Sequence, residues 1–376
     1  MKRLLLAGAG HAHLHVLKSM AVQRWRDVEV VLVSPYTRQI YSGMVPGWIA
    51  GHYTLDQCAA ELLPLVQRAG VRFIETSVTA LDASRRVATL GTGEEINYDV
   101  LSLDTGAVVD SEVLAGCGVT LLPIRPLETF VAGWVQQLAA LKQKSTANLV
   151  VVGGGAAGVE LALAARYRLA RELGSAQANV HLVAGGGLLN GHNPGVIRRV
   201  RRTLSQAGIR LLEGYASGTA TGIRLDNGAE LQADCVITAP GVQAARWLAN
   251  SGLTLAADGF IAVGDGQQSP SHPEVFAAGD VASRIDLPHA KSGVYAVRAG
   301  PVLTDNLARA LRDEAPACYA PQKRSLYLLA TGPQDAIVSW GNFSACGHWA
   351  WRWKDWIDRR FMRRYVVDEI SGCDGS

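Results

Sequence analysis

Two stretches of the chain share one hydrophobic pattern, in which an apolar run ends at a glycine-rich turn and continues with helical spacing. These stretches are KRLLLAGAGHAHLHVL (2–17) and ANLVVVGGGAAGVELALAARY (147–167). Each is followed by a second apolar run, VEVVLVSP (28–35) and ANVHLVAGG (178–186). Strand, glycine loop, helix and strand in this order begin a βαβ unit, so the pattern predicts two such units.

A second pair of matching segments lies downstream of the two glycine loops. YDVLSLDTGA (98–107) and ADCVITAPGV (233–242) are apolar runs that end near a glycine. Hairpin-like stretches precede both, and the one at 223–234 contains Asn-Gly, a strong signal for a two-residue turn. A further strand and turn, SHPEVFAAGDVAS (271–283), belongs to neither copy. We therefore predict that the second unit is inserted into the first.

A chain of 376 residues is long enough for two or three domains. We expect an α/β fold with two Rossmann-like dinucleotide-binding domains and a C-terminal α+β segment. The expected boundaries are 1–110 with 259–318 for the first domain, 111–258 for the inserted domain and 319–376 for the last segment. That segment contains two patterns that predict strands, RSLYLLATG and AIVSWG, and a tryptophan-rich helical pattern over 348–365.

Composition and charge exclude several classes of protein. The net charge is only +3, and no basic cluster interleaved with aromatic residues precedes the last thirty residues, which argues against nucleic-acid binding. The six cysteines are far apart and form no CxxC pair, which argues against a disulfide framework or a zinc site. No apolar run reaches the roughly 18 residues that cross a bilayer. We expect a cytoplasmic protein, and peripheral attachment to the inner membrane stays open.

The two glycine loops differ at their third position. Gly153, Gly155 and Gly158 make a complete GxGxxG motif between a strand and a helix, which predicts binding of a dinucleotide pyrophosphate. The first loop keeps Gly8 and Gly10 but has His13 in third place. Because the first two glycines approach the phosphates, we expect binding to survive, with a wider gap between helix and strand.

Three histidines at the first loop raise the alternative of a metal site. His11 and His15 are four residues apart and could share a helix face, whereas His13 points elsewhere. No carboxylate or cysteine nearby completes a ligand set, so we predict no metal. We expect His11 to lie near the pyrophosphate as a neutral hydrogen-bond donor, and His15 to lie at the surface or an interface.

The acidic residue that usually binds the ribose hydroxyls, at the end of the second strand, is missing from both units. Ser34 and Ala184 occupy these positions. Ser34 can still form one hydrogen bond, but Ala184 cannot, so the ordinary reason for preferring NAD over NADP is absent. The arginines of IRRVRR (197–202) could meet a 2′-phosphate, although a solvated helix face is the better interpretation.

The segment VFAAGDVA (275–282) predicts a strand that ends at Gly279 and Asp280, followed by a helix. A carboxylate in this place can accept hydrogen bonds from a ribityl chain while the helix N-terminus faces a pyrophosphate. The alternative is that Asp280 only caps the helix. Two dinucleotide loops in the same chain favour the first interpretation.

Together these motifs resemble the two-dinucleotide-binding-domain flavoproteins, the pyridine nucleotide-disulfide oxidoreductase superfamily, over nearly the whole chain. The resemblance implies FAD in the first domain and NAD(P)H in the inserted domain. It implies that Val78 meets the adenine through its backbone. Other FAD contacts are implied for Gly8, Gly10, Thr105, Gly106, Gly279 and Asp280, and nicotinamide-nucleotide contacts for Gly153, Gly155 and Gly158.

The paired redox cysteines of that superfamily are absent, and the chain is more similar to type II NADH dehydrogenases and sulfide:quinone reductases. GVEL (158–161) resembles the dehydrogenase pattern whose glutamate, here Glu160, lies near the flavin–nicotinamide contact. GAGHAHLHVL, YSGMVPGWIAGHY (41–53), LPHAKSGVYAVRAGPVLTDNL (287–307) and KDWIDRRFMRRY (354–365) resemble the branch that some organisms fuse to selenophosphate synthetase. The resemblance also implies that YSGMVPG covers the flavin.

The expected function is that of an FAD-dependent NAD(P)H oxidoreductase, which passes electrons to a quinone-like or other small acceptor. The acceptor stays open because Val294 and Arg298 align with the quinone-site glutamines of the dehydrogenases. Two alternatives are action on a sulfur or selenium compound and a slow flavin-binding partner or sensor. We expect a helix N-terminus and Lys291, in LPHAKSGVYAV, to stabilise the reduced flavin.

The terminal helical pattern carries its own alternatives. A helical projection places one broad aromatic face on Trp349, Trp353, Trp356, Ile357, Phe361 and Tyr365, interrupted by Arg360 and Arg364. Aromatic anchors with basic flanks are typical of a helix that lies at a membrane surface. The same pattern fits a helix docked on the first domain, or in a homodimer, with snorkelling arginines.

Overall fold

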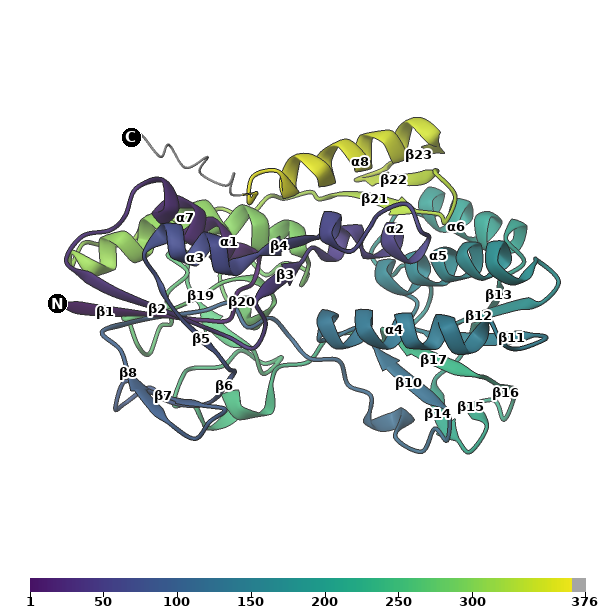
Figure 1. Cartoon of the computed structure of the whole chain (residues 1–376), viewed down its shortest axis with the longest axis horizontal. Coiled ribbons are helices and arrows are strands. Elements are labelled where there is room, and N and C mark those ends of the chain that lie inside the picture. Colours follow the sequence, from purple (N-terminus) through teal and green to yellow (C-terminus); the bar gives the residue numbers. More distant parts are fainter. Residues whose placement is uncertain (367–376) are drawn as a thin grey trace, which may run out of the picture.

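The computed structural model describes residues 1–366, so the end of the expected 319–376 segment, with Cys373, lies outside the described part. Two sheets of five parallel strands lie side by side, and the C-terminal strands and helix lie across one side of both domains (Figure 1). The chain enters the second sheet after completing most of the first and then returns to add a last strand. This path confirms that the second unit is inserted into the first.

The first sheet is built from the apolar runs that the sequence pattern singled out. Its strand order is β19-β9-β1-β2-β5, and the strands span Val275–Ala277, Val100–Leu103, Lys2–Ala7, Val28–Ser34 and Arg72–Glu75. The helices of this domain are α1 (His11–Val22), α3 (Leu62–Ala69) and α7 (Gly293–Leu311), of which α3 and α7 both pack against α1. Parallel strands need such helical cover because their apolar side chains project from both faces.

The second sheet repeats four strands of the first in the same order, but its edge strand β10 comes first in its domain, whereas β19 comes last in the other. Its order is β10-β17-β11-β12-β13, and the strands span Thr120–Pro123, Cys235–Thr238, Ala147–Val152, Ala178–Ala184 and Arg210–Glu213. Its helices are α4 (Leu127–Leu141), α5 (Ala156–Leu173) and α6 (Pro194–Gln206). The two copies of the βαβ pattern therefore fold as two copies of one domain.

A small antiparallel sheet follows the third strand of each copy, as the hairpin patterns predicted. One contains β6, β7 and β8 (Val78–Asp82, Val87–Leu90, Glu95–Asn97), and the other β14, β15 and β16 (Ala216–Thr219, Gly222–Leu225, Glu230–Gln232). Two-stranded sheets join β3 to β4 (Arg38–Ile40, Ala59–Glu61) and β18 to β20 (Ile261–Val263, Ala282–Arg284). Single 3-10 turns cover Ser42–Met44, Asp56–Cys58, Glu112–Leu114, Arg246–Asn250 and Gly279–Val281.

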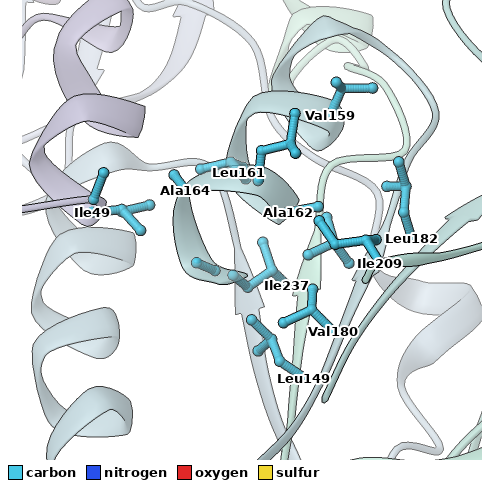
Figure 2. Close-up of a cluster of buried hydrophobic side chains, with 14 of the residues drawn as sticks. Ile49, Leu149, Val159, Leu161, Ala162, Ala164, Val180, Leu182, Ile209 and Ile237 are labelled. Atoms are coloured by element: carbon cyan, nitrogen blue, oxygen red, sulfur yellow. The ribbon is translucent and has the colours of Figure 1, made fainter. Parts of the chain in front are cut away.

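The two domains share a hydrophobic contact through the short helix α2 (Val45–Ile49). Ile49 lies beside Leu161 and Ala164 of α5, in the same buried cluster as Leu149 and Val180 of the second sheet (Figure 2). Because α2 follows the first domain's β3 in the chain, this contact anchors one domain in the core of the other.

The C-terminal segment forms three antiparallel strands and one helix. The strands β21 (Leu326–Ala330) and β22 (Ala336–Trp340) were expected, whereas β23 (Phe343–Gly347) was not. The helix α8 (His348–Met362) ends three residues before the expected end at 365.

The single aromatic face predicted for α8 is wrong. Trp349, Trp353 and Trp356 are exposed, whereas Phe361 and Tyr365 are buried against the first domain. The chain turns after Met362, so Tyr365 does not continue the helical face on which the projection placed it.

Candidate functional site

The complete glycine loop follows β11 and forms a cradle with open space at its tip. Gly153 has φ of +139°, and a Cβ there would overlap the carbonyl oxygen of Ala239. A Cβ at Gly158 would overlap the carbonyl oxygen of Gly153, which keeps α5 close to the strand. Gly155 has nothing near the position of a Cβ, so a ligand can approach its backbone.

The first loop replaces its third glycine with a hydrogen-bonded imidazole. His13 is fully buried, with Nδ1 2.5 Å from the carbonyl oxygen of Gly8 and Nε2 2.7 Å from the hydroxyl of Ser102. Burial lowers the pKa of His13 to about 4, so the ring is neutral. Nδ1 then donates to the carbonyl and Nε2 accepts from the hydroxyl. His13 thus closes the gap between helix and strand that glycine would otherwise close by contact.

Asp104 is a site residue that the motif analysis missed. Its buried carboxylate accepts hydrogen bonds from the backbone N–H groups of Ala12 and His13, at 2.8 and 2.9 Å. Burial raises its pKa to about 7. The available signal was the comparison of SLDTGA with ITAPGV, because Asp104 stands where the second copy has Ala239.

The segment after β19 differs from the expectation of a helix. Gly279–Val281 is one 3-10 turn that leads into β20, and α7 begins only at Gly293, with Ser292 at its N-cap position. Asp280 therefore does not cap a helix. Its buried carboxylate instead lies 2.5 Å from the Arg125 guanidinium, at the end of the segment that enters α4.

His11 lies close to this ion pair, at the start of α1. Its ring packs against both Tyr41 and Phe361, with ring centroids 5.5 and 6.0 Å away, and these two rings contact each other at 4.4 Å. Burial lowers its pKa to about 4, and Nε2 is buried with no partner among residues 1–366. His15, by contrast, lies at a helix interface and bonds Thr304 of α7 through Nδ1 at 3.0 Å.

A cavity opens beside Asp280 and is lined by Gly279, Lys291 and Tyr295, among others. Gln267 also lines it, and its Oε1 is buried without a partner among the described residues. Unsatisfied buried polar atoms are costly unless a ligand or water completes them. The Gln267 oxygen and the Asp280 carboxylate line this cavity, and the unpartnered His11 Nε2 lies near the same Asp280–Arg125 pair. These groups fit a ligand that offers hydroxyl groups and hydrogen-bonding ring atoms.

Lys291 lies on the wall of this cavity, two residues before α7. Its ammonium donates hydrogen bonds to the Ala282 carbonyl and, at 2.7 Å, to the Ser283 hydroxyl. It also lies 3.9 Å from the ring centroid of Phe260. Burial lowers the pKa of Lys291. The structure thus places its charge beside β20 rather than in the first turn of the helix.

Glu160 lies on α5, where both domains meet the C-terminal sheet. Its carboxylate accepts a 2.8 Å hydrogen bond from the backbone N–H of Ala330 on β21, and burial raises its pKa to about 7. On the facing helix α8, the Lys354 ammonium donates to the Gly43 carbonyl at 2.6 Å and pairs with Asp358 at 2.7 Å. The loop that precedes α2 is therefore held by α8.

The remaining predicted residues lie at the ends of strands around the first loop. Gly106, at φ +74°, follows Thr105 after β9, and the Thr105 backbone passes so close to Gly8 that only glycine fits there. Val78 is buried at the start of β6. Ser34 ends β2, and its hydroxyl donates to the Tyr36 carbonyl at 3.2 Å.

The arginines of IRRVRR lie on the outer side of α6. Arg198, Arg201 and Arg202 are exposed, whereas Arg199 contacts Ser344 of the C-terminal sheet. Within residues 1–366, no group of three or more His, Cys, Asp and Glu side chains is arranged to hold a metal ion.

Comparisons with known proteins agree with this geometry. The model of the family described as "Pyridine nucleotide-disulphide oxidoreductase" matches residues 2–298. The NADH dehydrogenase-like protein MT1860 of Mycobacterium tuberculosis is 30% identical over 313 residues, 77% of this chain and 75% of that protein. The sulfide:quinone oxidoreductase of Aquifex aeolicus superimposes with a TM-score of 0.80 at 17% identity, covering 97% and 91% of the two chains. NDH2 of Plasmodium falciparum, solved in complex with NADH, superimposes with a TM-score of 0.76 at 12% identity, covering 97% of this chain and 100% of that chain.

Proposed function

Because the chain belongs to the pyridine nucleotide-disulphide oxidoreductase family, in its NADH dehydrogenase-like branch, we propose that it oxidises NAD(P)H and reduces a quinone-type acceptor. Membership of the family implies FAD and NAD(P)H as the cofactors. The observation that carries the proposal is the duplicated cradle, two parallel sheets that share four strands in the same order and each carry a glycine loop between a strand and a helix.

FAD, when bound, supplies the centre that accepts a hydride from the nicotinamide. The protein's own residues then have to hold both nucleotides and fix their relative position. Gly8, Gly10 and the neutral His13 shape the first cradle, and Asp280 with Arg125 provides a paired charge for a ribityl hydroxyl chain. Gly153, Gly155 and Gly158 shape the second cradle.

We infer that Glu160 acts where the two domains meet. It lies on the helix that starts at the second cradle, and α2 of the first domain packs against that helix. Its carboxylate is oriented by the backbone N–H of Ala330. An ionised carboxylate there stabilises the positive charge that grows on a nicotinamide ring as its hydride leaves.

The C-terminal helix supports an acceptor that partitions into membranes. Aromatic side chains that are more than a third exposed lie on α8, namely Trp349, Trp353 and Trp356, and at the turn between β22 and β23, namely Trp340 and Phe343. Exposed arginines accompany them on α8, including Arg352 and Arg360. No helix in residues 1–366 is apolar and long enough to cross a bilayer. We infer that the protein attaches peripherally to the inner membrane through this aromatic and basic surface.

The sulfide:quinone oxidoreductase likeness favours sulfur chemistry as a second candidate function. The cysteines give it little support. Cys318 is exposed but bonded to the Asp265 carboxylate at 3.0 Å, which raises its pKa and disfavours the thiolate. Cys346 is exposed on β23, beside Arg199.

Anaerobic stopped-flow mixing separates these functions. The holoenzyme is first reduced with NADH or NADPH and is then mixed with a short-chain quinone. We expect rapid reduction by a nicotinamide nucleotide followed by rapid reoxidation by the quinone. Bleaching of the flavin band by sulfide alone would support the sulfur function instead, and no bleaching by either nucleotide would leave only a binding or sensing role.

A further inference from the structure

In both domains a glutamate lies beside the position from which the ribose-binding carboxylate is missing. In the first sheet, Ser34 at the end of β2 is the register partner of Glu75 at the end of β5. In the second sheet, Ala184 at the end of β12 is the register partner of Glu213 at the end of β13. Each copy therefore lacks the acid on its second strand and carries a glutamate directly beside that position on its third strand.

The distance between the strands is within the reach of a glutamate. Neighbouring strands of a sheet lie about 4.8 Å apart, and partners in a parallel register project their side chains on the same face. A glutamate side chain is about as long as this spacing and longer than the aspartate often found at the second strand. Glu75 and Glu213 are both exposed, so neither is held inside the core. Their carboxylates can lean back over the small residues Ser34 and Ala184.

The surroundings of Glu213 fit an adenosine. The turn that follows Ala184 consists of Gly185, Gly186 and Gly187, which leaves the backbone open. Tyr215 lies beside this turn, because a Cβ on Gly185 would be only 2.8 Å from its ring, yet 67% of Tyr215 is exposed. A flat, largely uncovered ring two residues beyond Glu213 offers a stacking surface for the adenine whose ribose the carboxylate would bind.

One basic residue is placed to compete for the same carboxylate. Arg201 of α6 donates to Glu213 at 2.7 Å, and both side chains are about half exposed. With the pair intact, the Glu213 carboxylate can accept from a ribose hydroxyl, and its charge disfavours a 2′-phosphate. Without the carboxylate, Arg201 becomes a free cation next to the same ribose.

We infer that the ribose-binding carboxylate of each cofactor has moved one strand across, to Glu75 for FAD and to Glu213 for the nicotinamide nucleotide, and that Glu213 makes the protein select NADH over NADPH. This inference rests on the two cofactors of the proposed function but not on its acceptor. It is therefore tested by binding measurements, to which the acceptor makes no difference.

The first test measures the dissociation constants of NAD⁺ and NADP⁺ on the oxidised holoenzyme by calorimetry. We expect Glu213→Gln to weaken the binding of NAD⁺ about tenfold, as loss of one charge-assisted hydrogen bond does. The same change should tighten the binding of NADP⁺. The double variant with Glu213→Gln and Arg201→Gln should lose that gain in NADP⁺ affinity. The matched control is Glu230→Gln, which breaks a similar exposed pair with Arg224 in the same domain and should change neither constant.

An unchanged ratio of the two constants in Glu213→Gln, with the thermal unfolding of wild type, would overturn the assignment of Glu213. If instead wild type binds neither nucleotide, the cofactor assignment of the proposed function fails, and this result is distinguishable from the first.

The second test follows FAD release from the holoenzyme by the rise in flavin fluorescence. Glu75→Gln should speed release about tenfold and leave the NAD⁺ to NADP⁺ ratio unchanged. Glu95→Gln is the control, because Glu95 pairs with Arg85 on the adjacent hairpin, away from the end of β2. Equal release rates from the Glu75→Gln and Glu95→Gln proteins would overturn the assignment of Glu75.

Discussion

Arg125 and Asp280 form an ion pair of 2.5 Å that joins the segment entering the second domain to the turn after β19. Asp280 is buried at the wall of the cavity beside β20, whereas Arg125 is partly exposed. The pair thereby links the first domain to the start of the second.

We predict that Asp280→Ala purifies with less than a tenth of the wild-type flavin, because the hydroxyl chain loses its acceptor and Arg125 loses its partner. Asp280→Asn should keep more flavin than Asp280→Ala, since an amide oxygen still accepts a hydrogen bond. Flavin content per chain is measured by absorbance after denaturation. Asp305→Ala, an exposed carboxylate on α7, is the control that should keep full flavin.

The buried imidazole of His13 predicts a pH-dependent stability. Its folded pKa of about 4 lies below the usual 6.5, so the unfolded chain binds a proton between these values and the folded chain does not. The free energy of unfolding should therefore fall as pH drops from about 6.5 to 4, by about 3 kcal/mol. The contributions of Asp and Glu titration to this free energy are common to both proteins, so they cancel when wild type is compared with His13→Gln.

The measurement is urea unfolding of wild type and His13→Gln between pH 4 and 7. Asp104, whose pKa is raised to about 7, makes the free energy of unfolding rise as pH falls, and it does so in both proteins. A difference in unfolding free energy that is constant over this range would contradict the neutral, buried assignment of His13.

Glu160→Gln should alter how flavin reduction depends on pH. The wild-type carboxylate, with a pKa raised to about 7, becomes ionised as pH rises through that value. We expect the rate of reduction by NADH to rise over this window, because the negative charge stabilises the growing charge on the nicotinamide. Single-turnover rates from pH 6 to 8.5 should be lower and flat in Glu160→Gln. If the rise of the reduction rate with pH persists in Glu160→Gln, the titrating group is not Glu160.

Lys291→Met should lower the midpoint potential of the bound flavin. The ammonium lies at the wall of the same cavity as Asp280, and a positive charge there stabilises an anionic reduced flavin. We expect a fall on the order of 30 mV, equivalent to about 1.4 kcal/mol for a two-electron couple. The potential is measured by equilibration with a reference dye. An unchanged potential would mean that the hydrogen bonds to Ala282 and Ser283 hold the charge out of reach.

The exposed tryptophans of α8 give a test of membrane attachment that spares the fold. Deleting the helix would remove Phe361 and Met362 from the core of the first domain. The triple variant Trp349→Ser, Trp353→Ser and Trp356→Ser changes only exposed side chains. It should lose cosedimentation with anionic phospholipid vesicles while keeping its flavin and its activity with a soluble quinone.

A matched variant sharpens that test. Val135→Ser and Val113→Ser replace exposed apolar side chains elsewhere on the surface and should leave vesicle binding unchanged. If wild type does not bind vesicles but is a dimer that the triple tryptophan variant dissociates, the aromatic surface is a subunit contact instead.

The repeated domain could be predicted because its signals are local. The apolar runs at 2–7 and 147–152 and the glycines beside them specify a strand and a turn without reference to distant residues. The same holds for β9 and β17, which end at matching places in the two copies.

The features that were missed depend on contacts between distant segments. The role of Asp104 arises only when β9 brings it under the first turn of α1. Phe361 and Trp349 look alike in a helical projection, and only the packing of α8 against the first domain separates the buried ring from the exposed one. Residues 282–284 form strand β20 instead of the helix expected after Asp280, because pairing with β18 satisfies their backbone hydrogen bonds.

The central claim is that one bound flavin receives electrons from a nicotinamide nucleotide held in the neighbouring domain. The most direct test is the absorption spectrum of the purified protein before and after anaerobic addition of NADH. The account predicts a flavin band at about one flavin per chain, bleached within a single turnover and recovered when a quinone is added. A folded protein that has no flavin band, and acquires none on incubation with FAD, would contradict it.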